Sequence, residues 1–167
     1  MSLIWIIVAL IAALAIIVAV GRERIWRLAG PPDLGDVTFE TLKRRATPND
    51  ALACPPSLCA ARSDLAPPVF ALPPDQLRTA LTRALAAEEL LERVASDDSH
   101  LQDRYVQRTR LMRFPDTIVV RFLAAGEGRS SPALYSRSQL GRRDLGANRA
   151  RIERWLKKLA REAPIVQ

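Results

Sequence analysis

The stretch GRRDLGANRARI, residues 141–152, brings together four arginines, two glycines, one aspartate and one asparagine. These residue types could bind a phosphate or carboxylate group, because guanidinium groups and the free N–H groups of a helix N-terminus both favour anions. The glycine spacing matches neither a P-loop, which needs Gly-Lys-Ser/Thr, nor the GxGxxG pattern of dinucleotide-binding folds. A carboxylate at Asp144 would also repel an anion from the same helix start.

A structural role for this stretch is the simpler interpretation. Gly141 lets the chain turn after a strand, and Asp144 can cap the helix that follows by accepting its free backbone N–H groups. Asn148 and Arg149 could bind loop carbonyls, and Asp144 could pair with an arginine. The residues assigned to this structural motif, or to a possible anion site, are Arg137, Arg142, Arg143, Asp144, Asn148 and Arg149. Nucleic acid is not an expected partner, because the aromatic side chains that stack on bases are few.

A second set of basic residues recurs along a predicted C-terminal helix, residues 145–161. Spacings of three and four residues place them on one side of the helix, beside an apolar stripe that includes Trp155 and Leu159. They are Arg151, Arg154, Lys158 and Arg161. We expect this basic stripe to face solvent and to contact anionic membrane headgroups or an acidic partner, with a plain solvated helix face as the alternative.

Cys54 and Cys59 are the only cysteines. A disulfide can close the short loop between them if their Cα atoms approach within about 7 Å. Two separate thiols, or a metal or redox site, are the alternatives. A structural zinc site needs four protein ligands, and the chain offers one histidine beside this pair. We therefore expect a disulfide, and we predict no metal and no cofactor.

His100 follows Asp97 and Asp98, an arrangement that could support general-base chemistry. A solvated position in a hairpin turn is the more common situation for such a histidine. The chain also lacks the Gly-x-Ser-x-Gly signature of a serine nucleophile. We therefore predict no catalytic residue and no enzymatic activity, with an enzyme of an unrecognised type as the alternative.

Hydrophobic periodicity and turn residues predict an ordered region that begins near residue 67. The predicted elements, in chain order, are a strand at 69–72, a helix at 74–87, strands at 90–95, 101–108, 117–123 and 133–137, and a helix at 145–161. This order (strand-helix-four strands-helix) favours an α+β fold, with a small antiparallel sheet and two helices packed on one face. We assign residues 67–167 to this domain. Residues 22–66, rich in proline, are assigned to an irregular linker and Cys-Pro segment.

Residues 3–20 form an unbroken run of apolar residues without a charge. As a helix the run would span about 27 Å, close to the roughly 30 Å of a bilayer's hydrocarbon core. A cleaved signal peptide would normally show a positively charged start, a shorter apolar core and an A-x-A-like site. Here only Met1 and Ser2 precede the run, and Val18-Ala19-Val20 is a poor cleavage site. We predict that residues 1–21 are a transmembrane helix that anchors the chain.

Two signals disagree on the side of the membrane that the domain occupies. Arg22, Arg24 and Arg27 follow the apolar run, which favours a cytoplasmic domain by the positive-inside rule. The cysteine pair favours an oxidising compartment. We expect a protein of the bacterial inner (cytoplasmic) membrane whose soluble domain is periplasmic.

Two motifs and the element order between them resemble a known family. CPPSLC, residues 54–59, is similar to an early cysteine-proline segment, and ALYSRSQLGRRDLGANRARI, residues 133–152, is similar to a closing motif. The chain thereby resembles the domain of unknown function 1499 family over about residues 40–162. It departs at Ser57-Leu58, where the family often has Pro-Asn, and at Ser138-Gln139, which separate Ser-Arg from the glycine segment. The resemblance implies a small domain, often exported or membrane-tethered, and no established activity.

We therefore expect a single-span membrane protein that is a non-catalytic interaction or accessory subunit of a larger inner-membrane complex. Residues 3–20 would contact membrane lipid. A binding module for a lipid or an anionic small molecule, held in the cleft between the sheet and the helices, is the alternative.

Overall fold

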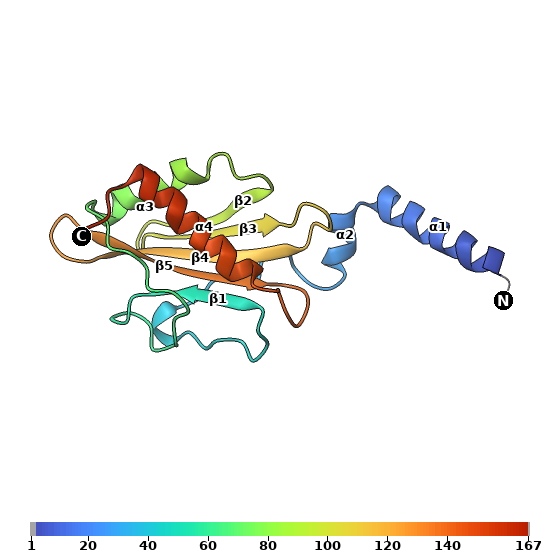
Figure 1. The fold of residues 1–167 in the computed structure, drawn as a ribbon, viewed down its shortest axis with the longest axis horizontal. Coiled ribbons are helices and arrows are strands. Elements are labelled where there is room, and N and C mark those ends of the chain that lie inside the picture. Colours follow the sequence, from blue (N-terminus) through green and yellow to red (C-terminus); the bar gives the residue numbers. More distant parts are fainter. Residues whose placement is uncertain (1–2, 167) are drawn as a thin grey trace.

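The computed structural model describes residues 3–166, which form two N-terminal helices followed by an α+β domain (Figure 1). Helix α1 (Leu3–Val20) extends away from the domain, and the short helix α2 (Arg22–Arg27) lies at the domain's edge. Gly21 separates the two helices at φ 80°, a left-handed conformation that favours glycine. Gly21 therefore ends α1 and lets the chain turn towards the domain.

A five-stranded antiparallel sheet forms the centre of the domain, with strand order β1-β5-β4-β3-β2. The bounds of the elements are β1 (Asp50–Ala53), α3 (Pro74–Leu85), β2 (Leu91–Asp97), β3 (Gln102–Arg108), β4 (Pro115–Ala124), β5 (Ser130–Ser138) and α4 (Ala147–Glu162), with a 3-10 helix at Phe39–Thr41. The predicted α+β class with an antiparallel sheet is confirmed.

The first strand of the sheet lies elsewhere in the chain than predicted. The strand expected at residues 69–72 does not form, and Phe70 makes only isolated bridges to Ser130 and Ile165. Instead β1, inside the segment expected to be irregular, pairs with β5. Its sequence DALA contains no β-branched residue, so local propensity does not indicate a strand. Pairing with a distant strand is what stabilises it.

Helices α3 and α4 cover one face of the sheet (Figure 1). Their apolar stripes form one buried cluster with Ile118 and Val120 of β4. The helix residues in that cluster are Leu77, Ala80, Leu81 and Leu85 of α3 and Ile152, Trp155 and Leu159 of α4. Trp155 is fully buried, and its ring meets Tyr105 edge-on with 5.6 Å between the ring centroids.

The opposite face of the sheet is covered by the N-terminal part of the domain. Phe39 and the two cysteines pack there against Val119 and Tyr135. Both faces of β4 are thereby buried, which explains why its sequence is a nearly continuous apolar run instead of an alternating one. Residues 37–61 therefore supply a layer of the core, within a segment for which the sequence predicts irregular structure.

Cys54 and Cys59 form a disulfide, as predicted. Their Cα atoms are 6.2 Å apart, and both residues are buried. The N–H of Cys54 donates to the Ser63 hydroxyl at 2.8 Å. The disulfide loop is therefore joined to the segment that follows it and to the sheet.

Replacing both cysteines with serine is expected to lower the free energy of unfolding by about 2 kcal/mol, the loop-closure value for so short a loop. Chemical denaturation of the wild-type chain with and without reductant is the matched comparison, because reduction removes the bond and keeps both sulfur atoms. Full labelling of both thiols in denatured, non-reduced protein would contradict the bond.

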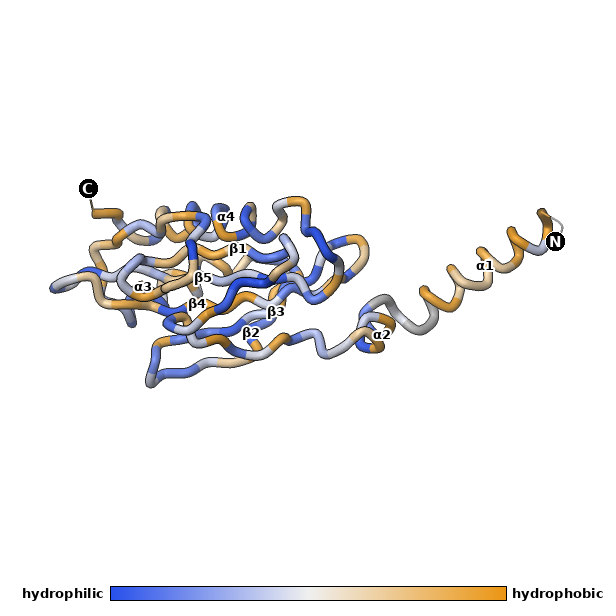
Figure 2. Tube along the Cα trace, turned by 90° about the horizontal axis from the view of Figure 1, so that it is seen from below, coloured by the Kyte–Doolittle hydropathy of each residue, from blue (hydrophilic) through white to orange (hydrophobic). Residues whose placement is uncertain are grey.

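Helix α1 forms over the residues predicted to span a membrane, and Figure 2 shows apolar residues along its described length. Within residues 3–166, however, no helix meets the combination of length and hydropathy that a membrane crossing requires. The predicted transmembrane role of residues 1–21 is therefore not confirmed. Residues 1 and 2 lie outside the described part of the chain.

Candidate functional site

The arginines of the predicted anion site do not gather in one place. Arg137 shares a sheet face with Tyr135, opposite the helices, and its guanidinium carbon lies 5.6 Å from the Tyr135 ring centroid. Its Nη2 donates to the carbonyls of Leu34 at 3.0 Å and Gly35 at 2.6 Å. Burial lowers the pKa of Arg137. Arg137 therefore fastens the N-terminal segment to the sheet and is separated by it from the other arginines of the motif.

The other three arginines of that predicted site lie at the surface. Arg149 pairs with Glu153, one turn further along α4, at 2.9 Å instead of binding a loop carbonyl. Arg142 and Arg143 occupy the exposed loop between β5 and α4, and neither has an ion-pair partner in the part of the chain that the structure describes. Arg143 and Arg149 nevertheless line one cleft of about 470 Å³, beside the carboxylates of Asp50, Asp64 and Asp144. The structure therefore brings two of the four predicted arginines to one cleft, and it places acidic groups among them.

Asp144 holds the start of α4, although the N-cap position is two residues later than predicted. The N-cap residue is Gly146, at φ 82°. The Asp144 carboxylate nevertheless accepts hydrogen bonds from the backbone N–H groups of Gly146 at 3.0 Å and Asn148 at 2.9 Å. It also accepts one from Asn148 Nδ2 at 2.7 Å. The predicted ion pair between Asp144 and an arginine is absent from residues 3–166.

Asp144→Ala is expected to lower the free energy of unfolding by about 0.5–2 kcal/mol, the range for losing a helix-capping side chain. Asp144→Asn keeps one acceptor oxygen and is expected to lose less. Urea denaturation of the wild type and both variants measures the two differences. Unchanged stability of Asp144→Ala would contradict the structural role assigned to this side chain.

Asn148 is the centre of a buried polar network between β5 and α4. It is fully buried, and its Nδ2 donates to the carbonyl of Asn49 at 3.0 Å and to the Ser138 hydroxyl at 2.9 Å. Its Oδ1 accepts a hydrogen bond from the Ser136 hydroxyl at 2.6 Å. The predicted bond from Asn148 to a loop carbonyl is present, and the network joins the residue before β1 to β5 and α4.

Arg151 belongs to the same network, and the prediction that it faces solvent is wrong. Its side chain is 7% exposed and pairs with Asp116, whose side chain is 5% exposed. Its Nε donates to Gln107 Oε1 at 2.8 Å, and its Nη1 donates to Ser136 Oγ at 2.8 Å and Asn148 Oδ1 at 2.7 Å. The guanidinium is therefore surrounded by acceptors from three strands and its own helix.

The helical period explains the buried position of Arg151. Residues three and four apart share a helix face, and Arg151 lies three residues after Asn148 and four before Trp155. All three are buried. A further signal lies in the strands, because Gln107 and Asp116 place polar groups on the helix-facing side. The three-residue spacing between Arg151 and Arg154 wrongly indicates an exposed position for Arg151, because it takes no account of the buried Asn148 and Trp155.

Of the other residues of the predicted basic stripe, Arg154 and Lys158 line a cleft, and Arg161 lies at the surface. Lys158 Nζ lies 2.5 Å and Arg154 Nε 3.4 Å from the same carboxylate oxygen of Glu88. Glu88 lies in the connection between α3 and β2, and its side chain is 9% exposed. Arg161 is exposed and has no ion-pair partner within the described residues. The four residues therefore do not form one open face.

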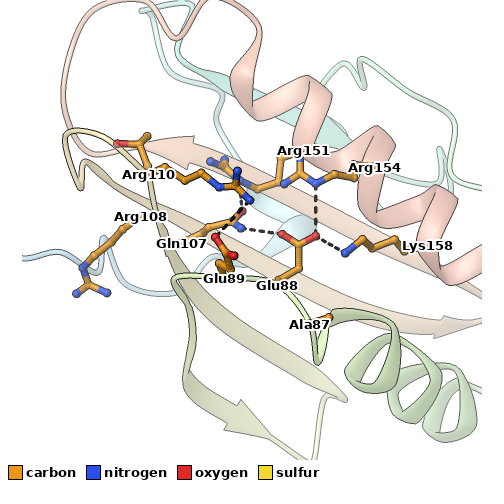
Figure 3. A pocket seen from close by; sticks show the side chains of 10 residues that line it. Ala87, Glu88, Glu89, Gln107, Arg108, Arg110, Arg151, Arg154 and Lys158 are labelled. Atoms are coloured by element: carbon orange, nitrogen blue, oxygen red, sulfur yellow. Dashed lines mark hydrogen bonds and ion pairs between the residues drawn. The ribbon is translucent and has the colours of Figure 1, made fainter.

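A cleft of about 470 Å³ opens between α4, the α3–β2 connection and the end of β3 (Figure 3). Its basic lining residues are Arg108, Arg110, Arg151, Arg154 and Lys158, and its acidic ones are Glu88 and Glu89. Figure 3 shows Glu88 between Gln107 on one side and Arg154 and Lys158 on the other. An anionic ligand in the cleft would have to compete with Glu88 for these donors.

Most of the domain matches a family defined by sequence. The family model described as "Protein of unknown function (DUF1499)" matches residues 44–159. The chain belongs to this family. The match includes the disulfide, all five strands and most of α4, and it leaves out α1 and α2. No curated protein and no solved structure matches the chain.

In this DUF1499 chain, Glu88 is held in its ionised form. Burial alone would raise its pKa, but hydrogen bonds from Lys158 and Gln107 and the charge of Arg154 outweigh burial and leave the pKa below its ordinary value. A general acid needs the opposite shift. Arg110 pairs with Glu89 at 3.2 Å, so both acidic residues of the cleft are engaged. Both carboxylates of the cleft are therefore paired with basic side chains.

His100 of the DUF1499 domain lies in the turn between β2 and β3, as predicted. Its Nδ1 is 2.7 Å from Asp97 Oδ2, and its side chain is 61% exposed. Hydrogen bonds from Ser99 and His100 lower the pKa of Asp97. Within residues 3–166, no cluster of three or more histidine, cysteine or acidic residues is placed to hold a metal ion.

Proposed function

We propose that this DUF1499 chain is a single-span, membrane-attached protein that acts through contacts and not through catalysis, as an accessory subunit of a larger inner-membrane complex. The observation that carries the proposal is the exposed apolar surface of α1. Leu3, Ile4 and Trp5 are 67–71% exposed, and residues 3–20 contain no charge. A surface of this kind marks a site of contact with lipid or with another protein.

Insertion suits α1 better than lying along a membrane surface. A helix that lies in the interface combines a charged face with an apolar one. Along α1, the described side chains of residues 3–17 are exposed and apolar on every side. Contact with lipid, or with a membrane helix of a partner, would cover all of them.

We place the domain on the periplasmic side of the inner membrane. The disulfide between Cys54 and Cys59 supports this side, because such bonds persist in oxidising compartments. The arginines that follow α1 favour the cytoplasmic side by the positive-inside rule. We give the disulfide greater weight, because it is a bond formed within the fold and not a count of charges.

The closing motif supports a role in contacts. Asp144, Asn148 and Arg151 bond to one another and to the sheet, so these residues are engaged within the fold. The ion pairs of the cleft likewise use both of its carboxylates. The described residues therefore offer charged surfaces for binding. Ser99 Oγ does lie 2.9 Å from His100 Nδ1, but this hydroxyl donates to Asp97 at 2.6 Å in an exposed turn.

Membrane fractionation of the full-length chain tests the attachment. The wild type is expected to stay with the membranes after alkaline extraction. The Leu10→Arg/Leu14→Arg variant is expected to be released, because each arginine near the helix centre opposes insertion by about 2.5–3.5 kcal/mol. Glu127→Arg, at the far end of the domain, is the control and should be retained. Release of the wild type would contradict the proposal.

Two further measurements test the side and the complex. Protease added to cells with a permeabilised outer membrane is expected to digest the domain, and protection in intact spheroplasts would place it in the cytoplasm. Native electrophoresis of a mild detergent extract is expected to show a complex larger than the 18.5 kDa chain in its detergent micelle. Migration as the single chain would contradict the accessory-subunit role.

A second candidate function is binding of an anionic small molecule or lipid headgroup in the cleft. The observation that favours it is the excess of basic over acidic side chains on the walls of a cleft of about 470 Å³. Titration with inorganic phosphate or glycerol phosphate tests it. Arg154→Gln/Lys158→Gln is expected to weaken binding, whereas Arg161→Gln, on the same helix outside the cleft, should not. Equal binding by all three proteins would reject the site.

A further inference from the structure

We propose that the end of the domain nearest α1 is a docking surface for an anionic lipid bilayer. This inference rests on the membrane attachment proposed above, and it adds a second contact made by the folded domain itself. The surface consists of α2 with Leu28, the β3–β4 loop at residues 109–114, and the β5–α4 loop at residues 139–146. We call this surface the end face.

Strand register brings the three segments of the end face together. Arg108 pairs with Pro115 at the close of the β3–β4 hairpin, and Asp116 pairs with Ser138 at the end of β5. The loops that follow β3 and β5 therefore leave the sheet at the same end of its strands. Figure 1 shows α2 beside this end and α1 leading away from it.

Exposed apolar side chains gather at the end face. Outside α1, the large hydrophobic residues that remain exposed in the described chain are Leu28, Leu111, Met112, Leu145 and Ile165. All but Ile165 lie on the end face, and Leu28 and Leu145 are 89% and 96% exposed. Exposed hydrophobic residues are usually scattered singly over a soluble surface. Their concentration at one end, in three separate segments, indicates a contact surface.

The loop that carries Leu145 is built to present this side chain outward. Leu145 has φ 53°, a left-handed conformation that a leucine rarely adopts. Asp144 binds the backbone on one side of it, and Asn49 Nδ2 donates to the carbonyl of Gly141 at 2.7 Å. The strained conformation is therefore held by the surrounding hydrogen bonds, as is common where a residue has a binding role.

Positive charge surrounds these apolar side chains. Arg24, Arg27, Arg142 and Arg143 are exposed, and none has an ion-pair partner within residues 3–166. Of the acidic groups nearby, Glu23 pairs with Arg108 at 3.6 Å, and the Asp144 carboxylate, bound only by neutral N–H groups, offsets one of these four arginines. The charge left over is positive. Apolar side chains among arginines are the combination by which proteins bind anionic lipid surfaces.

Contacts of α2 fix how the end face is oriented towards a membrane. The rings of Trp26 and Phe114 lie 4.6 Å apart between centroids, and Trp26 Nε1 donates to the carbonyl of Met112 at 2.5 Å. The segment that follows α1 is thereby fastened to the β3–β4 loop. An inserted α1 would hold the end face beside the headgroups, where even weak contacts are favoured by the high local concentration.

Spin labelling of the full-length chain in vesicles tests the proposal. Because the native cysteines are bonded to each other, Leu145→Cys supplies one reactive thiol on the end face, and Glu127→Cys supplies one in the β4–β5 turn at the opposite end. In vesicles of phosphatidylglycerol and phosphatidylcholine, the label at 145 is expected to be more accessible to oxygen than to a water-soluble nickel complex. The label at 127 is expected to show the reverse.

The controls separate docking from attachment. In phosphatidylcholine alone, or with Arg142→Gln/Arg143→Gln added, the label at 145 is expected to become as water-accessible as the label at 127. A label at 145 that is water-accessible in every vesicle that holds the chain would overturn docking and leave attachment intact. A chain that does not float with vesicles would overturn both. A label at 145 that is shielded only in native membranes would overturn lipid docking in favour of a protein partner.

Discussion

Arg151→Leu is expected to lower the free energy of unfolding by about 3–5 kcal/mol, the cost of removing one partner of a buried ion pair. Leucine would leave the Asp116 carboxylate charged, with its side chain 5% exposed and its partner gone. It would also remove the donor that Gln107, Ser136 and Asn148 share. Denaturant unfolding followed by far-UV circular dichroism measures the difference.

Arg161→Gln is the matched control for this variant. Arg161 lies on the same helix, but it is exposed and has no ion-pair partner in the described part of the chain. Its replacement is expected to change the free energy of unfolding by no more than about 0.5 kcal/mol. Equal losses in the two variants would mean that Arg151 is a surface residue like Arg161, against the structure.

Trp155→Ala is expected to have an effect of similar size, about 3–5 kcal/mol, because it leaves a cavity where a large aromatic side chain fills the core. Trp155 is fully buried between α4 and the sheet, and it makes the edge-on contact with Tyr105. Thermal and denaturant unfolding are both expected to report the loss.

Trp155→Phe separates the packing of the ring from its polar atom. The indole N–H of Trp155 has no hydrogen-bond partner within the described residues, so phenylalanine leaves no acceptor unpaired. Phenylalanine also keeps an aromatic ring in the core, and its cost is expected to be clearly smaller than that of alanine. A cost for phenylalanine as large as that for alanine would show that a single aromatic ring does not fill this part of the core.

Much of the fold can be predicted from the sequence, because its strongest patterns are local. Helices α3 and α4 follow apolar stripes at helical spacing, and β4 follows a run of β-branched residues. The strand β1 could not be predicted in this way, because DALA is a poor strand sequence that is stabilised by pairing with β5 far along the chain. Pairing between distant segments leaves no periodic signal in either one.

The candidate site is harder to predict, because it depends on which way each charged side chain points. Ser136 and Arg137 are adjacent in β5, yet Ser136 joins the buried network beneath α4 and Arg137 binds the N-terminal segment on the other face. Strand alternation predicts that they diverge, but not what each one meets. Glu88 has no distinguishing pattern in the sequence AAEELL, and only the packing of α4 over its loop brings Lys158 to it.

The residues of the closing motif, 133–152, have two different roles. Asp144, Asn148 and Arg151 join α4 to the sheet; Asn148 and Arg151 are buried, and Asp144 is half-buried. Arg142, Arg143 and Leu145 come from the same stretch but lie at the surface. The inward residues are expected to affect stability, whereas the outward ones are expected to affect membrane contact.

A double-mutant cycle on Arg151 and Asp116 tests most directly whether the closing motif builds the fold. Asp116→Asn removes the buried charge that Arg151 neutralises. Arg151→Leu is therefore expected to cost about 2 kcal/mol less in the Asp116→Asn background than in the wild type, a coupling typical of residues in one buried network. The same cost in both backgrounds, within about 0.5 kcal/mol, would show that the two side chains act independently and would contradict the structural role assigned to the motif.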